Sequence, residues 1–137
     1  MIGAELINGE PPPLAGVVCE ALICTAWWRD GALEDPAQQI SLRINNGWHR
    51  LYFDQGFVFW RPLPGPPEPN VSPDNDWSYP LQDLGTEQGL AGQRIEGLDV
   101  VEQQDVTIVT LRFADGRRLV LSSSHAVDRT EVEVVGP

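Results

Sequence analysis

His49 and His125 are the only histidines among the 137 residues, and histidine is the side chain best suited to proton transfer near neutral pH. Ser124, His125 and Asp128 supply the residue types of a nucleophilic triad. A serine adjacent to its histidine cannot easily direct its hydroxyl toward the imidazole, and the G-x-S-x-G motif of many hydrolases does not occur. We therefore predict that His49 lies at a hairpin, that His125 lies in a solvated turn, and that the protein has no catalytic residue and is not an enzyme.

Metal-binding and cofactor-binding patterns are incomplete in this sequence. The Asp-Asn-Asp run at 74–76 resembles part of a calcium loop, but its sixth position is Tyr79, where such a loop needs glycine. Cys19 and Cys24 would point to opposite faces of an extended strand, too far apart to form a disulfide, and no nearby histidine completes a zinc site. We predict a polar turn at 74–76, two small buried thiols, no metal and no cofactor.

The aromatic residues are unevenly distributed along the chain. The final third of the sequence contains a single ring, Phe113, so a core shared by two similar halves does not account for the others. Tryptophan and tyrosine are enriched at protein interfaces and ligand clefts. The alternative explanation is that the proline-rich segment 62–80 folds over the first half and covers the rings. The crowded rings include Trp27, Trp28, Trp48, Tyr52, Phe57, Phe59, Trp60, Trp77 and Tyr79.

We select as candidate binding residues five of these rings together with three carboxylates. The carboxylates would attract a cationic partner, and the rings would supply buried contact area. The alternative is that the acidic pair at 34–35, like Asp99, Glu102 and Asp105, is solvated and keeps a strand edge from pairing. The candidate binding residues are Trp48, Tyr52, Trp60, Trp77, Tyr79, Glu34, Asp35 and Asp54.

The charge of the chain excludes two classes of partner. Twenty acidic residues against nine arginines, with no lysine, give a formal net charge of −11. Nucleic acids and anionic membranes both require basic patches, so we expect neither as a partner. The N-terminal residues 1–6 lack the basic region of a signal peptide, and the apolar run 14–28 is interrupted by Glu20 and too short to span a bilayer. We therefore predict a cytoplasmic protein.

Alternating apolar residues indicate β-strands through most of the chain. Ile40, Leu42 and Ile44 alternate with polar residues, and Asn46-Gly47 then supplies residue types suited to a tight turn. Similar patterns predict strands at 50–53, 57–60, 109–113, 118–121 and 131–135. The segment 14–28 is open to two interpretations. It is either a bent strand, which we favour, or a helix that starts after the proline run.

Two blocks of the sequence resemble each other. Residues 14–22 and 90–98 are identical at five of nine positions, and both begin with Leu-Ala-Gly. Residues 41–47 then match 110–116 in the same order and next to the same kind of turn. These two matches predict an internal duplication. Because 90–102 contains two glycines, it suits a bent strand better than a helix, and the same element is expected in both copies.

The predicted duplication divides the chain into a first β repeat at 14–61, a connector at 62–89 and a second β repeat at 90–135. Seven prolines between 62 and 80 exclude a regular element from that part of the connector. Each repeat would form about four up-and-down strands and leave one apolar face to cover. We expect a single all-β domain over 1–137, or a β-rich α+β domain if 14–28 is helical. Its two halves would be related by a pseudo-twofold axis, as a sandwich or partly open barrel of about eight strands.

In size, acidity, β-rich patterning and the L-x-F-x-D-G-R-x-L run at 111–119, the chain resembles small acidic bacterial immunity proteins and uncharacterised bacterial β-rich domains. The resemblance implies a non-catalytic protein that occludes a basic toxin domain, with acidic side chains such as Glu34, Asp35 or Asp54 facing its basic residues. No functional site of that group can be transferred residue by residue.

Two other functions stay open at this point. The chain could bind or transform a small molecule in a cleft between its halves, or it could form a structural homodimer through an exposed strand edge. The cleft of the first alternative would be lined by Trp48, Tyr52, Trp60 and Trp77.

Overall fold

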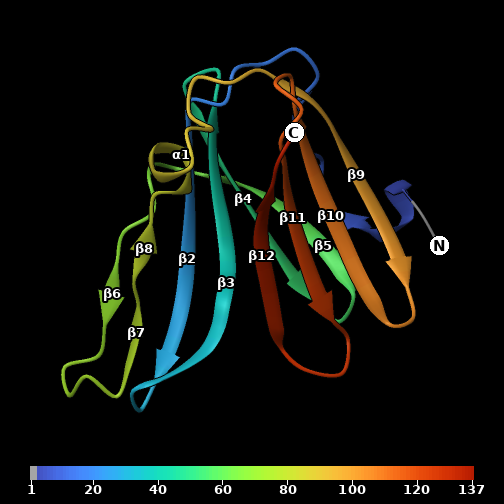
Figure 1. The fold of residues 1–137 in the computed structure, drawn as a ribbon. Coiled ribbons are helices and arrows are strands. Elements are labelled where there is room, and N and C mark those ends of the chain that lie inside the picture. Colours follow the sequence, from blue (N-terminus) through green and yellow to red (C-terminus); the bar gives the residue numbers. More distant parts are fainter. Residues whose placement is uncertain (1–2) are drawn as a thin grey trace.

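The computed structural model describes residues 3–137, which form twelve strands and two short helical segments (Figure 1). Met1 and Ile2, with which the N-terminal segment begins, lie outside the described residues. The helical segments are a 3-10 helix (Gly3–Leu6) and α1 (Leu84–Glu87). The strands are β1 (Ile7–Asn8), β2 (Ala21–Arg29), β3 (Ala32–Ile44), β4 (Gly47–Asp54), β5 (Phe57–Leu63), β6 (Asn70–Val71), β7 (Trp77–Tyr79), β8 (Leu81–Gln82), β9 (Ile95–Gln103), β10 (Val106–Phe113), β11 (Arg118–Ser124) and β12 (Arg129–Val135).

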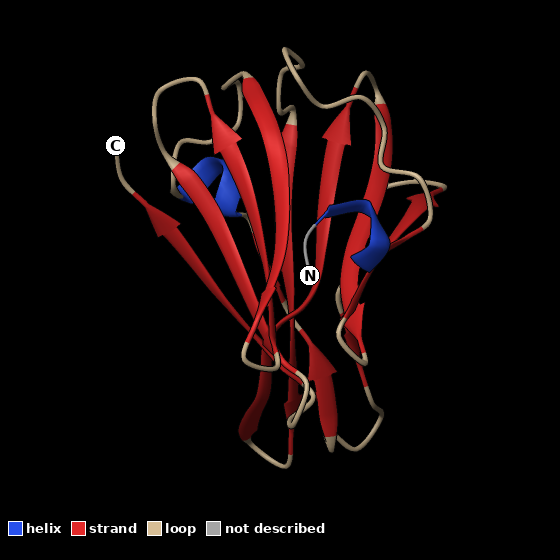
Figure 2. Ribbon diagram, turned by 90° about the vertical axis from the view of Figure 1, so that its right-hand side faces the viewer, coloured by secondary structure: helices blue, strands red, loops and turns tan. Residues whose placement is uncertain are grey.

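The strands form two sheets that face each other (Figures 1 and 2). The first sheet has the order β1-β5-β4-β3-β2-β7-β6, with β8 also paired to β2, and the second has the order β12-β11-β10-β9. Each sheet contains a four-stranded antiparallel meander, β2–β5 in one and β9–β12 in the other. The all-β prediction is therefore confirmed, and within residues 3–137 the sheets do not close into a barrel.

Four hairpins of the meanders use the same two-residue turn. Both central residues have positive φ in each of them, which matches the right-handed twist of the flanking strands. The predicted turn at Asn46-Gly47 is shifted by one residue, because Asn45 and Asn46 take the left-handed conformation and Gly47 starts β4. Asparagine tolerates that conformation, so the glycine is not needed at the turn itself. The four central pairs are 30–31, 45–46, 55–56 and 104–105.

Residues 14–28 and 90–102 each form a turn followed by a strand, so the helical alternative is wrong. In residues 14–28 the strand β2 starts at Ala21, and in 90–102 the strand β9 starts at Ile95. The Leu-Ala-Gly sequences that precede them both form tight turns. The N–H of Val17 donates to Leu14 O at 3.1 Å, and the N–H of Gln93 donates to Leu90 O at the same distance.

The two Leu-Ala-Gly segments also pair with each other in a reciprocal way. An isolated antiparallel bridge joins Val18 to Arg94, which are equivalent positions of the two blocks. The hydrogen bonds on either side form two pairs that exchange when the blocks are exchanged: Gly16 N to Ile95 O with Gly92 N to Cys19 O, and Cys19 N to Gln93 O with Ile95 N to Val17 O. The backbone at this junction is therefore locally two-fold symmetric.

One hydrophobic core lies between the sheets. The burial of alternate residues in β10 and β11 confirms the predicted strand pattern, with Phe113, Leu119 and Leu121 each 1% exposed. In the first sheet the buried set includes Leu22, Ile40, Leu42, Ile44, Leu51, Val58 and Trp60. Within residues 3–137, neither helical segment has the length and apolar character that a membrane crossing would require.

The connector is more ordered than its proline content suggests, and the exclusion of regular elements from 62–80 is wrong. Strand β5 continues through Pro62, beyond the two residues of β5 that pair with β1, at an edge where proline is tolerated. The short strands β6 and β7 occupy the proline-free stretches and extend the sheet beyond β2. The helix α1 follows, with Asp83 as its N-cap, whose side chain accepts a hydrogen bond from Thr86 N at 3.1 Å.

Candidate functional site

Four of the predicted binding residues, Asp35, Tyr52, Asp54 and Tyr79, line one cavity of about 380 Å³. We call it the aromatic cavity. Its walls come from the start of β3, the end of β4, strands β2 and β7, and the turn between β11 and β12, so both meanders contribute. The complete lining is Trp27, Asp35, Gln38, Tyr52, Phe53, Asp54, Tyr79, Asp128 and Thr130.

A β-bulge in β3 places Asp35 in this cavity. The pairing of β2 with β3 shifts between Thr25 and Trp27, because Thr25 pairs with Gln39 whereas Trp27 pairs with Asp35. Pro36 lies in the extra residues, and proline within a sheet is found mainly at bulges and edges. The bulge frees the first part of β3 to approach β12 of the other sheet, where Asp35 Oδ1 accepts a hydrogen bond from Thr130 N at 2.9 Å.

Asp35 is 6% exposed, so the alternative that it lies on a solvated face is wrong. Its Oδ1 also accepts a hydrogen bond from Ala37 N at 3.1 Å, and within residues 3–137 no hydrogen bond ends on Oδ2. Burial raises the pKa of this carboxyl above its ordinary value, the two backbone hydrogen bonds oppose the rise, and the charge of Asp128 adds to it. The sequence did not indicate this burial, because it depends on the contact between β3 and β12.

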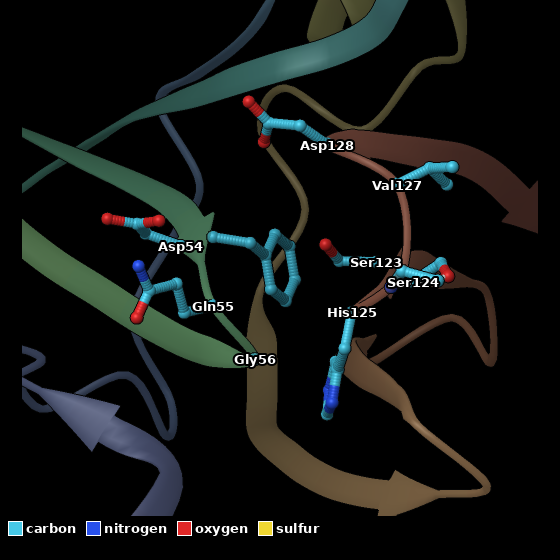
Figure 3. A pocket seen from close by; sticks show the side chains of 10 residues that line it. Asp54, Gln55, Gly56, Ser123, Ser124, His125, Val127 and Asp128 are labelled. Atoms are coloured by element: carbon cyan, nitrogen blue, oxygen red, sulfur yellow. Dashed lines mark hydrogen bonds between the residues drawn. The ribbon is translucent and has the colours of Figure 1, made fainter.

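A second cavity of about 240 Å³ adjoins the first and shares Phe53, Asp54 and Asp128 with it. We call it the turn cavity. Figure 3 shows Asp54 and Gly56 of the β4–β5 turn on one side and the 123–128 turn on the other, with the His125 ring directed away from Asp128.

His125 lies in a turn as predicted, but its ring is held in place rather than solvated, which corrects that part of the prediction. Its Nε2 lies 2.7 Å from the hydroxyl of Thr107, which is fully buried, and 3.6 Å from Glu102 Oε2. The Thr107 hydroxyl donates its proton to Gly56 O at 2.7 Å, so the oxygen accepts from the ring N–H. A hydroxyl whose proton is already donated to a carbonyl is not activated as a nucleophile, and this cluster joins the two sheets instead.

A row of aromatic rings runs from the aromatic cavity to β7, the strand next to the edge strand β6. Trp27 and Tyr79 are nearly parallel with centroids 6.5 Å apart, and Trp77 meets Tyr79 edge-on at 5.6 Å. At the outer end of the row, Trp77 is 36% exposed. Trp28 is 37% exposed, but it pairs with Ser78 and therefore lies on the other face of the sheet from Trp77 and Tyr79. A partly exposed tryptophan such as Trp77 is of the residue type that most often dominates the energy of a protein interface.

The other predicted residues lie elsewhere. Trp60 is 2% exposed and belongs to the core between the sheets, so it is not available to a partner. Trp48 lies near the start of β4, about 20 Å along the strand from Asp54 at the spacing of β-residues. Glu34 points its carboxylate at Arg29, with Oε1 to Nε at 3.4 Å. His49 lies within β4 and pairs with Leu42, and two residue pairs separate it from the turn of the β3–β4 hairpin.

Five residues of the aromatic cavity were not among the predicted site residues. Trp27 was recognised as part of the aromatic excess and Asp128 as part of the unlikely triad, but nothing in their spacing placed them together. A proline inside a strand pattern, here Pro36, was the one signal of a bulge that could have separated Asp35 from the regular ladder. The five are Trp27, Gln38, Phe53, Asp128 and Thr130.

No group of three or more histidine, cysteine or acidic side chains in the described part of the chain is placed to hold a metal ion. The Asp-Asn-Asp run at 74–76 belongs to the polar turn between β6 and β7, as predicted, with Asn75 at positive φ. The two cysteines are free and buried, also as predicted.

Both thiols are expected to be inert in the folded protein. Burial raises the pKa of Cys19 and of Cys24 to about 12, with smaller contributions from the charges of Glu20 and Asp35 respectively. At about pH 8 only a trace of either thiol is ionised, and the thiolate is the reactive species. A disulfide reagent such as Ellman's should therefore modify neither cysteine in the native protein and both in guanidinium chloride. Rapid modification of one equivalent under native conditions would contradict this.

Comparison of the chain with protein-family models, with curated proteins and with solved structures gives no match to any of them.

Proposed function

We propose that this protein is a non-catalytic binding module for a basic protein partner, acting by occlusion in the manner of an immunity protein. The observation that carries the proposal is the joint placement of rings and carboxylates at one end of the two sheets. Asp54 and Asp128 lie at the cavity there, and the partly exposed Trp77 continues the aromatic row on β7. Tryptophans supply the binding energy of an interface, and a net charge of −11 steers a basic partner toward it.

A purified partner provides the test. We expect immobilised protein to retain from a lysate of its host a basic protein that, once purified, forms a stoichiometric complex whose affinity falls as ionic strength rises. Trp77→Ala should weaken this complex by roughly tenfold or more. The matched control is Trp48→Ala, the same substitution about 20 Å along β4 from Asp54, and it should leave the affinity unchanged.

Three results would contradict the proposal. An acidic or neutral partner would contradict the electrostatic argument. If the two substitutions weaken the complex equally, the aromatic row is not the binding surface. A complex made only of two copies of this chain would favour the structural homodimer instead. We expect the interaction to take place in the cytoplasm, on the sequence grounds given above.

The aromatic cavity also supports a second candidate, a small-molecule binding protein. Its volume of about 380 Å³ lies within the range of ligand pockets, and its walls come from both meanders. Of the four residues expected to line a cleft between the halves, it contains only Tyr52. This function would be favoured by a small molecule that binds the pure protein stoichiometrically and is not displaced when protein partners are added.

We further propose that the two meanders are copies of one ancestral unit. The reciprocal hydrogen bonds of the two Leu-Ala-Gly segments support this, because they pair equivalent positions of the matched blocks. β3 has 13 residues whereas its counterpart β10 has 8, so the extra residues of the first copy lie in β3 with its bulge at Pro36. Asp35 and Gln38 of the cavity would thus belong to the part of the first copy that has no counterpart in the second.

A further inference from the structure

We propose that the aromatic cavity binds the guanidinium group of an arginine side chain, presented by the basic partner on which the proposed function rests. The inference starts from the charge of the cavity. Three of its nine lining residues are aspartates, and none is lysine, arginine or histidine. An uncompensated set of carboxylates at a partly enclosed site raises the local concentration of cations.

The positive charges nearby cancel this field only in part. Burial raises the pKa of Asp35, and the charge of Arg129 lowers it by a smaller amount. Arg29 pairs with Glu34 at 3.4 Å, and Arg129 pairs with Glu131 at 2.7 Å. Arg50 lies over the ring of Tyr52 and forms no ion pair within residues 3–137, so three carboxylates face one uncompensated arginine. No metal-binding group is formed by the described residues, which leaves an organic cation as the matching ligand.

The aromatic walls select a flat cation. Trp27, Tyr52, Phe53 and Tyr79 all line the cavity, and cations are attracted to the faces of such rings, with arginine the commoner partner. The chain itself shows that the rings of this sheet accept a guanidinium. Its own three examples are Arg29 over Trp27 at 5.6 Å, Arg50 over Tyr52 at 5.2 Å and Arg61 over Phe59 at 5.3 Å. Because Tyr52 already contacts Arg50 and stacks on Phe59, a bound guanidinium would use the remaining cavity rings.

A carboxylate acceptor is left over for the ligand. Asp35 is 6% exposed and lines the cavity, yet both of its hydrogen bonds end on Oδ1. Its Oδ2 accepts none from the described residues. A guanidinium presents several N–H donors in a fixed fork and can stack on a ring while it donates to a carboxylate, which an ammonium group cannot do in the same way. Asp54 and Asp128, at the mouth shared with the turn cavity, would take the remaining donors.

The test uses short capped peptides that contain arginine, its neutral isostere citrulline, or lysine, titrated into the full-length protein and followed by tryptophan fluorescence and NMR. The arginine peptide should bind roughly tenfold more tightly than either other peptide. The double variant Asp54→Asn/Asp128→Asn should lose most of that preference. Its matched control, Glu68→Gln/Asp74→Asn, makes the same change in net charge at residues that do not line the aromatic cavity and should bind as the wild type does.

Equal binding of the citrulline peptide would overturn the inference, and equal binding of the lysine peptide would overturn the choice of guanidinium. Equal weakening by the control variant would show a general charge effect and no site. These results are separable from the proposed function. If a basic partner binds the cavity variant as tightly as the wild type, the proposed function stands and the arginine site is wrong. If the arginine peptide binds but no protein partner is found, the arginine site stands and the proposed function is wrong.

Discussion

Replacing Asp35 by alanine is expected to make the protein about 2–6 kcal/mol less stable than replacing it by asparagine, because each of two buried donors left without a partner costs about 1–3 kcal/mol. The two donors are the N–H groups of Ala37 and Thr130, which both reach Asp35 Oδ1. Asparagine keeps an oxygen in that place, whereas alanine removes it. Urea denaturation of the two variants, followed by tryptophan fluorescence, measures the difference.

The same carboxyl should give a pH dependence that asparagine abolishes. Burial raises its pKa above the unfolded value of 3.8, so the folded state binds the proton more tightly than the unfolded state. Its contribution is fully present below that value and is lost as pH rises through the folded pKa. Asp35→Asn should therefore match the wild type near pH 3 and exceed it in stability near neutral pH. A constant difference between the two proteins across this range would contradict the burial of the charge.

Asparagine would thus serve the fold at least as well as the native aspartate at neutral pH. What asparagine cannot supply is a negative charge in the aromatic cavity. A cation bound there would oppose the effects of burial and of Asp128 on the Asp35 carboxyl. The structural role of this side chain therefore needs only an oxygen acceptor, whereas the binding role needs a negative charge. A stable Asp35→Asn variant would show that the fold does not require the charge.

Much of the fold could be predicted because it depends on local patterns. The alternation at Val109, Leu111 and Phe113 reports which side of β10 faces the core, and the burial of these residues agrees with it. Turn residues gave the hairpins, with an error of one residue at Asn45-Asn46 because asparagine substitutes for glycine in the left-handed conformation. The prediction that 14–28 and 90–102 take the same form rested on sequence similarity and was correct.

The cavity could not be predicted, because it depends on contacts between distant segments. Asp35 is buried by Thr130 of β12, and Tyr79 reaches Trp27 only because β7 pairs with β2 across the proline-rich connector. Neither pairing leaves a periodic signal in the sequence. Counting rings and carboxylates therefore identified the right residue types, including four of the cavity residues, but also selected Trp60, whose side chain the core requires.

Gly56→Ala is expected to destabilise the protein by about 2–4 kcal/mol, the sum of about 1 kcal/mol for a left-handed alanine and about 1–3 kcal/mol for overpacking. Gly56 has φ of +83°, and a Cβ built on it would lie 2.8 Å from the Nε2 and Cε1 atoms of His125. The ring cannot retreat freely, because its Nε2 bonds to Thr107 and its backbone N–H donates to Asp105 O at 2.9 Å.

Gly31→Ala is the matched control for this substitution. Gly31 occupies the second position of the β2–β3 turn with φ of +78°, and nothing lies within 4 Å of the Cβ it would gain. It should therefore show the backbone penalty of about 1 kcal/mol alone. A double-mutant cycle with His125→Ala completes the measurement, since removing the ring should relieve the extra loss of Gly56→Ala and leave Gly31→Ala unaffected. If both glycine substitutions lower the free energy of unfolding equally, the residues around the turn cavity move to accommodate the new methyl group. The contact between the β4–β5 turn and the second sheet would then not be rigid.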